Sequence, residues 1–524
     1  MKSHQSAGEV VPATHGPWLG FVAMCIGMFM AILDVQVVAT SLPSIQVSLQ
    51  IAPDQMSWVQ TAYLIAEIIA IPLTGFLTRV LTMRWLFVTA ISVFTIASMG
   101  CAASGDFAAL ISWRVLQGFS GGTLIPAVFA AVFVLFPVRQ QGLATTIAGV
   151  VAVLAPSVGP VVGGWITETY SWHWLFLINV APGIVAAVGA ASLLPGENAD
   201  LAAARKLDWL SLLLMAVALA SLEIGLKQAP HDGWMSIVVL SLLASSVVAG
   251  AGFLSRTVQA ESPLVDLTTF GDRSFTAGCL LSFVLGMGLF GSVYLMPVFL
   301  AFVRAHNSLE IGLIMLATGV AQLVTAPIVV VLERRVDARV LTSCGFAVFG
   351  LGLGLSAFQT PDTDAGDMFW PQIIRGLAIM FCLLPPTRLA LGALSAERVP
   401  DASGLFNLMR NLGGAVGLAL LDTVIYSRVP VLAADLEARL AAGDASAAAL
   451  VGIPAGIFAS RPLGPLDQAT QALIAPMIEK AAFAAAINEA WALLAALTLS
   501  AIVVIPFAFR RYEPGSVGAE PGFH

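Results

Sequence analysis

Long apolar runs alternate with short polar segments along most of the chain. Fourteen of these runs are long enough for a membrane helix, which needs roughly 20 apolar residues. They lie at about 17–42, 57–78, 83–104, 108–133, 142–166, 173–194, 208–227, 234–254, 275–302, 309–332, 338–358, 369–392, 402–428 and 487–509. The first run is too long for a cleaved signal peptide and carries an acid, Asp34. The pattern predicts an all-α polytopic membrane protein with fourteen transmembrane helices.

Basic residues predict the orientation of these helices, because Lys and Arg concentrate in cytoplasmic loops. If residues 1–16 are cytoplasmic, fifteen of the 24 Lys and Arg residues fall in cytoplasmic segments. We therefore expect cytoplasmic tails at 1–16 and 510–524. The long segment 429–486 is then extracytoplasmic. It is too polar to span, contains an Ala-rich stretch from Leu436 to Leu450 that is expected to be helical, and is interpreted as a loop that forms either a flexible cap or a docking surface for a partner.

Composition agrees with a membrane protein and excludes other classes. Hydrophobic residues make up 58% of the chain and charged residues 10%, with a mean hydropathy of +0.91; soluble proteins are about 25% charged. The net charge of −7 argues against a nucleic-acid partner. The five cysteines are scattered singly and no HExxH pattern occurs, so no metal site is predicted.

A weak internal repeat divides the chain. Three residues near the second run recur 255 residues later with the same spacing: Pro72, Arg79 and Arg84 match Pro327, Arg334 and Arg339. Gln117 matches Arg375 at an offset of 258. The repeat predicts an N-terminal six-helix half (17–194), a linker with two inserted helices (195–274) and a C-terminal six-helix half (275–509). Parallel six-helix repeats place a transport site between the halves, near the membrane midplane.

Several motifs follow one another in the order found in a known family. Leu33-Asp34-Val35 through Leu42-Pro43 resembles its first-helix pattern, and Arg114 to Gly118 resembles its fourth-helix motif. The fifth-helix antiporter motif is matched by Ala155, Pro156, Gly159, Pro160, Gly163 and Gly164. Trp172 to Gly183 and Asn407 to Gly417 match two further stretches. The chain therefore resembles the fourteen-span drug:proton antiporters of the major facilitator superfamily.

This resemblance implies a function, a location and partners. It implies a proton-coupled multidrug efflux antiporter of the bacterial inner membrane that exports amphipathic hydrophobic compounds by alternating access. Members of the family work with a periplasmic adaptor protein and an outer-membrane channel. The proton gradient supplies the energy and no cofactor is expected. Membrane lipid and small-molecule drugs are the other expected partners.

The loop motif after the second run departs from the family pattern. Gly75, Arg79 and Arg84 occupy its place, but Arg79 stands where the family often has Asp, and Thr82 where it has Gly. A gating contact that depends on that Asp is therefore in doubt.

Acids within apolar runs are the best candidates for proton coupling. Glu67 lies ten residues into the second run, roughly 15 Å along a helix and thus near the midplane, and Asp34 lies in the outer third of the first. An acid at the centre of a membrane helix raises the free energy of membrane insertion by about 2.5–3.5 kcal/mol, so we expect each of these acids to have a structural or functional role. We predict coupling roles for Asp34, Glu67 and Arg114, which could pair with either acid; the alternative is that the acids are only structurally paired.

The residues of a substrate cavity are harder to assign from sequence. Small residues four apart in the antiporter motif predict close helix packing and a hinge. Cavity candidates are polar or aromatic side chains within runs: Trp58, Tyr63, Gln117, Tyr294, Asn407, Arg410 and Asp422. For Glu223, in the inserted hairpin, packing or pairing at the lipid interface is the expected role.

Two alternatives to drug export stay open. The basic residues Arg114, Arg375 and Arg410 would suit an anionic cargo such as a metabolite, fatty acid or siderophore. A membrane enzyme or sensor would need a catalytic cluster or an added soluble domain. The GxSxG match at Gly118 and the GxGxxG match at Gly286 lie inside apolar runs rather than strand–turn–helix units, and no Walker-A motif occurs. We therefore expect a transporter rather than an enzyme.

Overall fold

The computed structural model describes residues 16–51, 58–196, 199, 207–260, 263–454, 458 and 468–507, which contain helices and no strand. The expected tail 510–524 and all but Gly16 of the tail 1–16 lie outside these residues. Thirteen helices within them are long and apolar enough to cross a membrane, by length and composition. The protein is all-helical and polytopic, as predicted. The count of fourteen spans and the cytoplasmic termini stay predictions.

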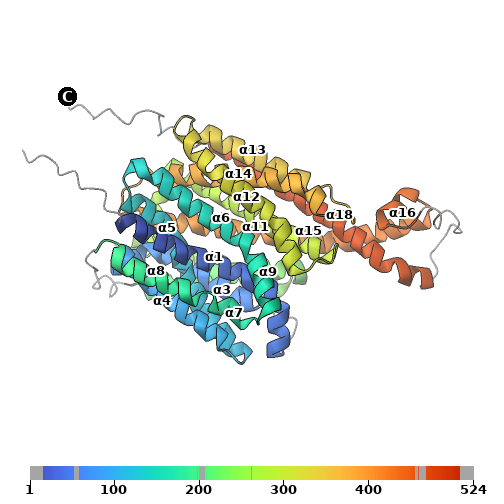
Figure 1. Cartoon of the computed structure of the whole chain (residues 1–524), viewed down its shortest axis with the longest axis horizontal. Coiled ribbons are helices and arrows are strands. Elements are labelled where there is room, and N and C mark those ends of the chain that lie inside the picture. Colours follow the sequence, from blue (N-terminus) through green and yellow to red (C-terminus); the bar gives the residue numbers. More distant parts are fainter. Residues whose placement is uncertain are drawn as a thin grey trace, which may run out of the picture.

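The helices form two groups with a hairpin between them (Figure 1). The N-terminal half contains α1 (Gly16–Leu49), α3 (Trp58–Ala70), the 3₁₀ turn η1 (Ile71–Leu73), α4 (Thr74–Ala102), α5 (Phe107–Leu135), α6 (Val138–Thr169), α7 (His173–Leu177) and α8 (Val180–Leu193). The hairpin is α9 (Trp209–Asp232) and α10 (Ile237–Gln259), followed by η3 (Leu267–Gly271). The C-terminal half contains α11 (Arg273–Phe302), α12 (Ser308–Glu333), α13 (Ala338–Leu355), α14 (Ala365–Leu391), α15 (Val399–Ala441), α16 (Ala445–Val451), α18 (Gln468–Val504) and η4 (Ile505–Phe507).

Polar caps explain where many of these helices begin. The Asp106 carboxylate accepts a hydrogen bond from the Ala109 amide at the start of α5, and Asp208 and Asp272 cap α9 and α11 in the same way. Asn307 and Glu310 form a reciprocal capping box on α12. Such caps satisfy amides that have no partner within the helix.

The run from Trp58 to Ala102 holds two of the expected spans, which divide at Thr82. Thr82 has φ 72° and ψ 160°, so the helix is interrupted there. Before it, Tyr63 and Glu67 lie against Gly118 and Gly122, so α3 runs parallel to α5. After it, Ser98 bonds Gln117 and Gly100 lies against Trp113, so α4 runs antiparallel to α5. The chain therefore reverses direction between these contacts.

The expected loop 429–486 is largely helical where the structure describes it. α15 continues to Ala441, α16 follows, and α18 begins at Gln468, well before the expected 487. An apolar cluster holds the three helices together, with Leu436 and Leu440 packed against α16 and Ile474 and Ile478. We call residues 429–454 and 468–486 the projection. It stands at the end of the bundle opposite the start of α1 (Figure 1).

Each half has its own hydrophobic core. Phe21, Phe87 and Phe94 belong to the core of the N-terminal half, and Phe299, Phe346 and Trp491 to that of the C-terminal half. A further apolar cluster joins Leu73 of the N-terminal half to Leu405 and Phe406 of the C-terminal half, and the surface between the halves can carry a site.

Candidate functional site: a cavity between the halves

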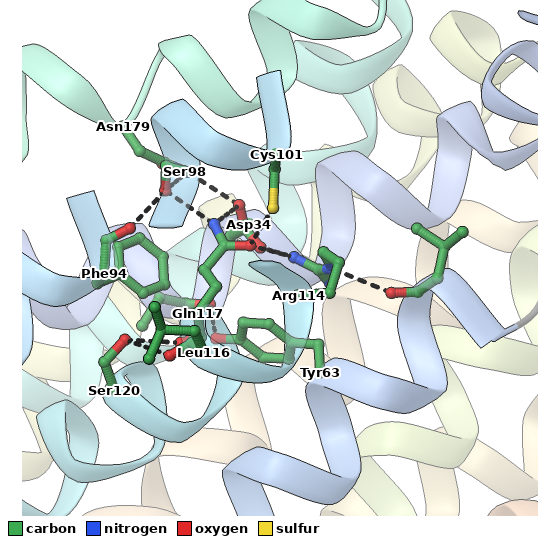
Figure 2. A network of polar contacts seen from close by, with 12 residues as sticks. Asp34, Tyr63, Phe94, Ser98, Cys101, Arg114, Leu116, Gln117, Ser120 and Asn179 are labelled. Atoms are coloured by element: carbon green, nitrogen blue, oxygen red, sulfur yellow. Dashed lines mark hydrogen bonds and ion pairs between the residues drawn. The ribbon is translucent and has the colours of Figure 1, made fainter. Parts of the chain in front are cut away.

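A buried polar network lies inside the N-terminal half (Figure 2). Asp34 of α1 and Arg114 of α5, both fully buried, form an ion pair with an N–O distance of 2.5 Å. The other Asp34 oxygen accepts hydrogen bonds from Gln117, at 3.0 Å, and from Asn179, at 2.8 Å. Arg114 also donates to the Val59 carbonyl at 3.0 Å. Of the two acids considered for Arg114, the structure selects Asp34.

This network connects α1, α3, α4 and α5, and the Tyr63 ring packs against its arginine. Ser98 of α4 accepts a hydrogen bond from Gln117 at 2.8 Å. The Arg114 guanidinium lies 4.3 Å from the centre of the Tyr63 ring, and Tyr63 donates to the Ala31 carbonyl. None of these side chains lines the central cavity. Asp34 is thus a paired acid within one half.

The central cavity, of about 150 Å³, lies where the two halves and the inserted hairpin meet. Its walls are mostly apolar, with side chains such as Ile68, Leu289 and Phe290. The polar and charged side chains among them are Gln36, Glu67, Glu223, Asn407, Arg410 and Asn411. An apolar cavity with a few convergent polar groups is the usual form of a small-molecule site.

The structure brings only some of the predicted cavity residues to this site. Asn407 and Arg410 line it, and the Arg410 guanidinium donates a hydrogen bond to the Asn407 side chain. The other five lie elsewhere. Tyr63 and Gln117 belong to the buried network, Tyr294 bonds Asp422 at 2.5 Å, and Trp58 is 39% exposed beside Lys227. Aromatic or polar character within a run does not indicate which face of the helix points to the cavity.

Glu223 is the cavity residue that differs most from expectation. It lies on α9, which reaches both halves: Lys227 donates to Thr61 of α3, and the His231 ring lies 4.4 Å from the Tyr426 ring of α15. This position turns Glu223 toward the cavity rather than toward lipid. An acid within an apolar run was the signal that could have identified it, as it identified Asp34 and Glu67.

Glu67 and Glu223 share the cavity and their charges interact. Glu67 is 7% exposed. Neither carboxylate forms an ion pair within 4 Å among the residues that the structure describes. Two carboxylates in an apolar site favour the binding of positive charge, either a proton or a cationic ligand.

The antiporter-motif residues place α6 between the two halves. A side chain at Gly159 would collide with Gln36 of α1, and Ser41 and Thr167 hydrogen-bond across the same pair of helices at 2.5 Å. Pro156 lines the cavity and Ala155 is fully buried. Gly312 of α12 packs against Val161 on the other side of α6. The close packing predicted for the motif is present, while its hinge role stays a prediction.

Two of the loop-motif residues, Gly75 and Arg79, join the halves. Arg79 forms an ion pair with Asp401 of α15, whose carboxylate lies against Gly75. Arg84 instead donates to the Ala191 and Leu194 carbonyls of the same half. The acid that the loop lacks is therefore supplied by the opposite half. We call Gly75, Arg79 and Asp401 the latch.

Two rigid helical halves, a shared cavity and a latch across one end define a membrane transporter of the alternating-access type. The model of the Major Facilitator Superfamily matches residues 24–418, and the chain belongs to this family. It is a multi-pass protein of the inner membrane.

Curated relatives cover most of the chain. It is 40% identical over 424 residues to the colistin resistance protein EmrB of Acinetobacter baumannii, covering 81% of this chain and 83% of the relative. It is 29% identical over 501 residues to the multidrug export protein EmrB of Escherichia coli K12, covering 95% of this chain and 96% of the relative. It is also 29% identical over 417 residues to the fatty acid resistance protein FarB of Neisseria gonorrhoeae, covering 79% of this chain and 82% of the relative.

A solved structure supports the fold. The human organic anion transporter MFSD10 superposes with a TM-score of 0.57 at 13% identity, covering 93% of this chain and 99% of that one.

Proposed function

We propose that this transporter is a proton-coupled multidrug efflux antiporter that exports amphipathic, mainly cationic, hydrophobic compounds. The observation that carries the proposal is the central cavity, in which Glu67 and Glu223 lie among mostly apolar side chains and form no ion pair within 4 Å among the described residues. The names of the EmrB relatives support export of drugs. Transport, not catalysis, is the activity, and the proton gradient drives it without a cofactor.

The two carboxylates provide a mechanism of exchange. When the cavity faces the outside, protons bind Glu67 and Glu223 and a cationic substrate loses its counter-charges. When it faces the cytoplasm, proton loss restores the charge that attracts the next cation. The apolar walls bind the hydrophobic part of the substrate, since burying apolar area is favourable by roughly 25 cal/mol per Å².

Exchange is tested with acid-loaded everted vesicles and a pH dye, by adding lipophilic cations and organic anions in turn. We expect cations to release protons from vesicles with the wild-type chain, each of Glu67→Gln and Glu223→Gln to weaken the signal, and the double variant to abolish it. Asp422→Asn is the matched control, because Asp422 is an acid of α15 outside the cavity. Full proton release by the double variant would contradict the proposal.

An anionic cargo is the second candidate, and Arg410 is the observation that favours it. Arg410 is the one arginine among the described cavity-lining residues, and the relative named for fatty acid resistance points the same way. Proton release on adding anions alone would assign this cargo and remove the cationic one.

We also propose that the projection docks a periplasmic adaptor that leads to an outer-membrane channel. The apolar cluster around Leu440, which is fully buried, gives the projection a fixed shape suited to docking. Leu440→Asp should remove drug resistance in cells while leaving proton exchange in vesicles. The control Leu450→Asp changes a side chain that is 46% exposed and should leave both intact. If Leu440→Asp keeps as much drug resistance as Leu450→Asp, the pump works without an adaptor.

A further inference from the structure

A second arginine, on α14, is buried and has no ion-pair partner among the residues that the structure describes. Arg375 is 3% exposed, and its Nε and Nη1 atoms have no hydrogen-bond partner among the described residues. Its Nη2 atom contacts the Met296 sulfur at 3.5 Å, and its guanidinium lies 4.7 Å from the centre of the Trp491 ring. Neither neighbour neutralises the charge. Burying an unpaired charge is costly, so such a group usually has a ligand.

The internal repeat shows what is missing. In the N-terminal half, Arg114 of α5 is neutralised by Asp34 of α1. In the C-terminal half, the offset of 258 places Gln372 of α14 at the position of Arg114, and the arginine, Arg375, stands one helical turn further on, at the position of Gln117. The positions of α11 that match Asp34 at offsets of 255 and 258 are Leu289 and Ser292. One half therefore contains a complete pair of opposite charges and the other only the cation.

Space for a ligand adjoins Arg375 on two sides. A polar cavity of about 300 Å³ is lined by Arg375 together with Ser356, Gln359, Thr360 and Thr363. A smaller cavity of about 30 Å³ is lined by Arg375, Ser292 and Gln322, and it shares Val153, Pro156, Leu289, Val293 and Ile379 with the central cavity. Arg375 thus stands between a polar chamber of the C-terminal half and the transport site.

The walls of the larger cavity suit an anion of low charge. The Thr360 and Thr363 hydroxyl groups bond each other at 3.2 Å, which leaves one of their two protons to donate, while the Ser356 hydroxyl donates to the Gly352 carbonyl. The only acid among the described lining residues is Asp367, which is exposed. A guanidinium binds carboxylates and other anions through charge-assisted hydrogen bonds.

We propose that Arg375 and this polar cavity form a binding site for a small monovalent anion. Two sources share this chemistry: an inorganic anion such as chloride, and the carboxylate of an organic acid. The bound anion supplies the charge that Asp34 supplies in the other half. The proposal depends neither on the cargo nor on proton coupling, so it can fail while the proposed function stands.

The test measures thermal unfolding of the purified full chain at constant ionic strength. Chloride, acetate, butyrate and octanoate are each titrated against a bulky sulfonate. We expect saturable stabilisation of the wild type, lost in Arg375→Gln, and at least a ten-fold weaker apparent affinity in Arg375→Lys, whose ammonium lacks the planar fork. Arg304→Gln is the matched control, since Arg304 is paired with Asp364; it should keep the response.

A second variant tests the site without deleting the arginine. Ser292→Asp places a carboxylate in the small cavity that Arg375 lines, so the chain should become insensitive to added anions. If chloride and the carboxylates stabilise the chain against thermal unfolding equally, the site binds an inorganic anion. If stabilisation increases with the length of the acid, the site binds an organic anion. No saturable response in the wild type, or an unchanged response in both Arg375→Gln and Ser292→Asp, would overturn the proposal.

Discussion

Asp34 and Arg114 form a pair whose first consequence is stability. Both side chains are fully buried, and the pair connects α1 to α5. Asp34→Asn would leave the guanidinium without its counter-charge, and breaking a buried pair in this way costs about 3–5 kcal/mol. We expect a loss of that size in chemical unfolding of the purified protein, with part of it recovered in Asp34→Asn/Arg114→Gln.

Glu67→Gln provides the comparison for this prediction. Glu67 has no ion-pair partner within 4 Å among the described residues, so its neutralisation should cost far less stability. Equal stability of Asp34→Asn and the wild type would show that the pair contributes little to folding. Lost transport in Asp34→Asn is therefore informative only when the variant is shown to be folded.

Thr82 adopts a backbone conformation that favours glycine. Its φ of 72° and ψ of 160° lie in a region costing about 1–3 kcal/mol for other residues. Thr82→Gly should therefore raise the melting temperature, with a net gain of about 1 kcal/mol after the entropy cost of glycine. Thr78→Gly, in the adjoining helix, is the control and should lower it. A lower melting temperature in both variants would argue against strain at Thr82.

At the scale of elements, apolar runs predicted the helices because a membrane helix depends on local sequence alone. What surrounds each helix is not local. An acid within its run marks Glu223 as a candidate site residue, but the side chain faces the cavity because α9 contacts both α3 and α15, which the run itself does not indicate. The end of α15 and the start of α18 were also misplaced, since both helices continue beyond the expected runs into the projection. The network around Asp34 could be anticipated in part, because its members lie in recognisable motifs.

A charged cluster joins two loops at one end of the C-terminal half. The His306 ring bonds Asp364 at 2.9 Å and Glu310 at 3.1 Å, and Arg304 donates to Asp364 at 2.9 Å. The hydrogen bond to Asp364 raises the pKa of His306 above its usual 6.5. The hydrogen bond from Arg304 lowers the pKa of Asp364 from 3.8 to about 2.

These shifts predict a stability that depends on pH. A raised His306 pKa stabilises the fold fully below pH 6.5, and this contribution is lost as the pH rises through the raised value. The Asp364 contribution is present above 3.8 and is lost as the pH falls toward 2. His306→Gln should thus lower the melting temperature at pH 5.5 and much less at pH 9. In Arg304→Gln the loss should not vary over this range; a His306→Gln loss independent of pH would contradict the assignment.

For the whole molecule, the sequence repeat and the motif order predicted two halves with a site between them. The gating contact was in doubt because the loop lacks the family's Asp. The structure places Asp401 of the opposite half against Arg79. The two residues are 322 positions apart, a pairing that no local motif can indicate.

The latch predicts how the halves respond to a single methyl group. A side chain at Gly75 would collide with the Asp401 carboxylate and lie 2.7 Å from its Cα atom, so Gly75→Ala must separate the halves at this end. Val138 and Val340 are exposed and belong to opposite halves. Spin labels attached at these two positions should report a longer distance between the halves in this variant. Cys344, which is exposed, is replaced by Ser so that it is not labelled as well. Gly105→Ala is the control, because nothing lies within 4 Å of that position. An unchanged distance in Gly75→Ala, together with unchanged proton exchange, would show that the latch does not hold the halves together.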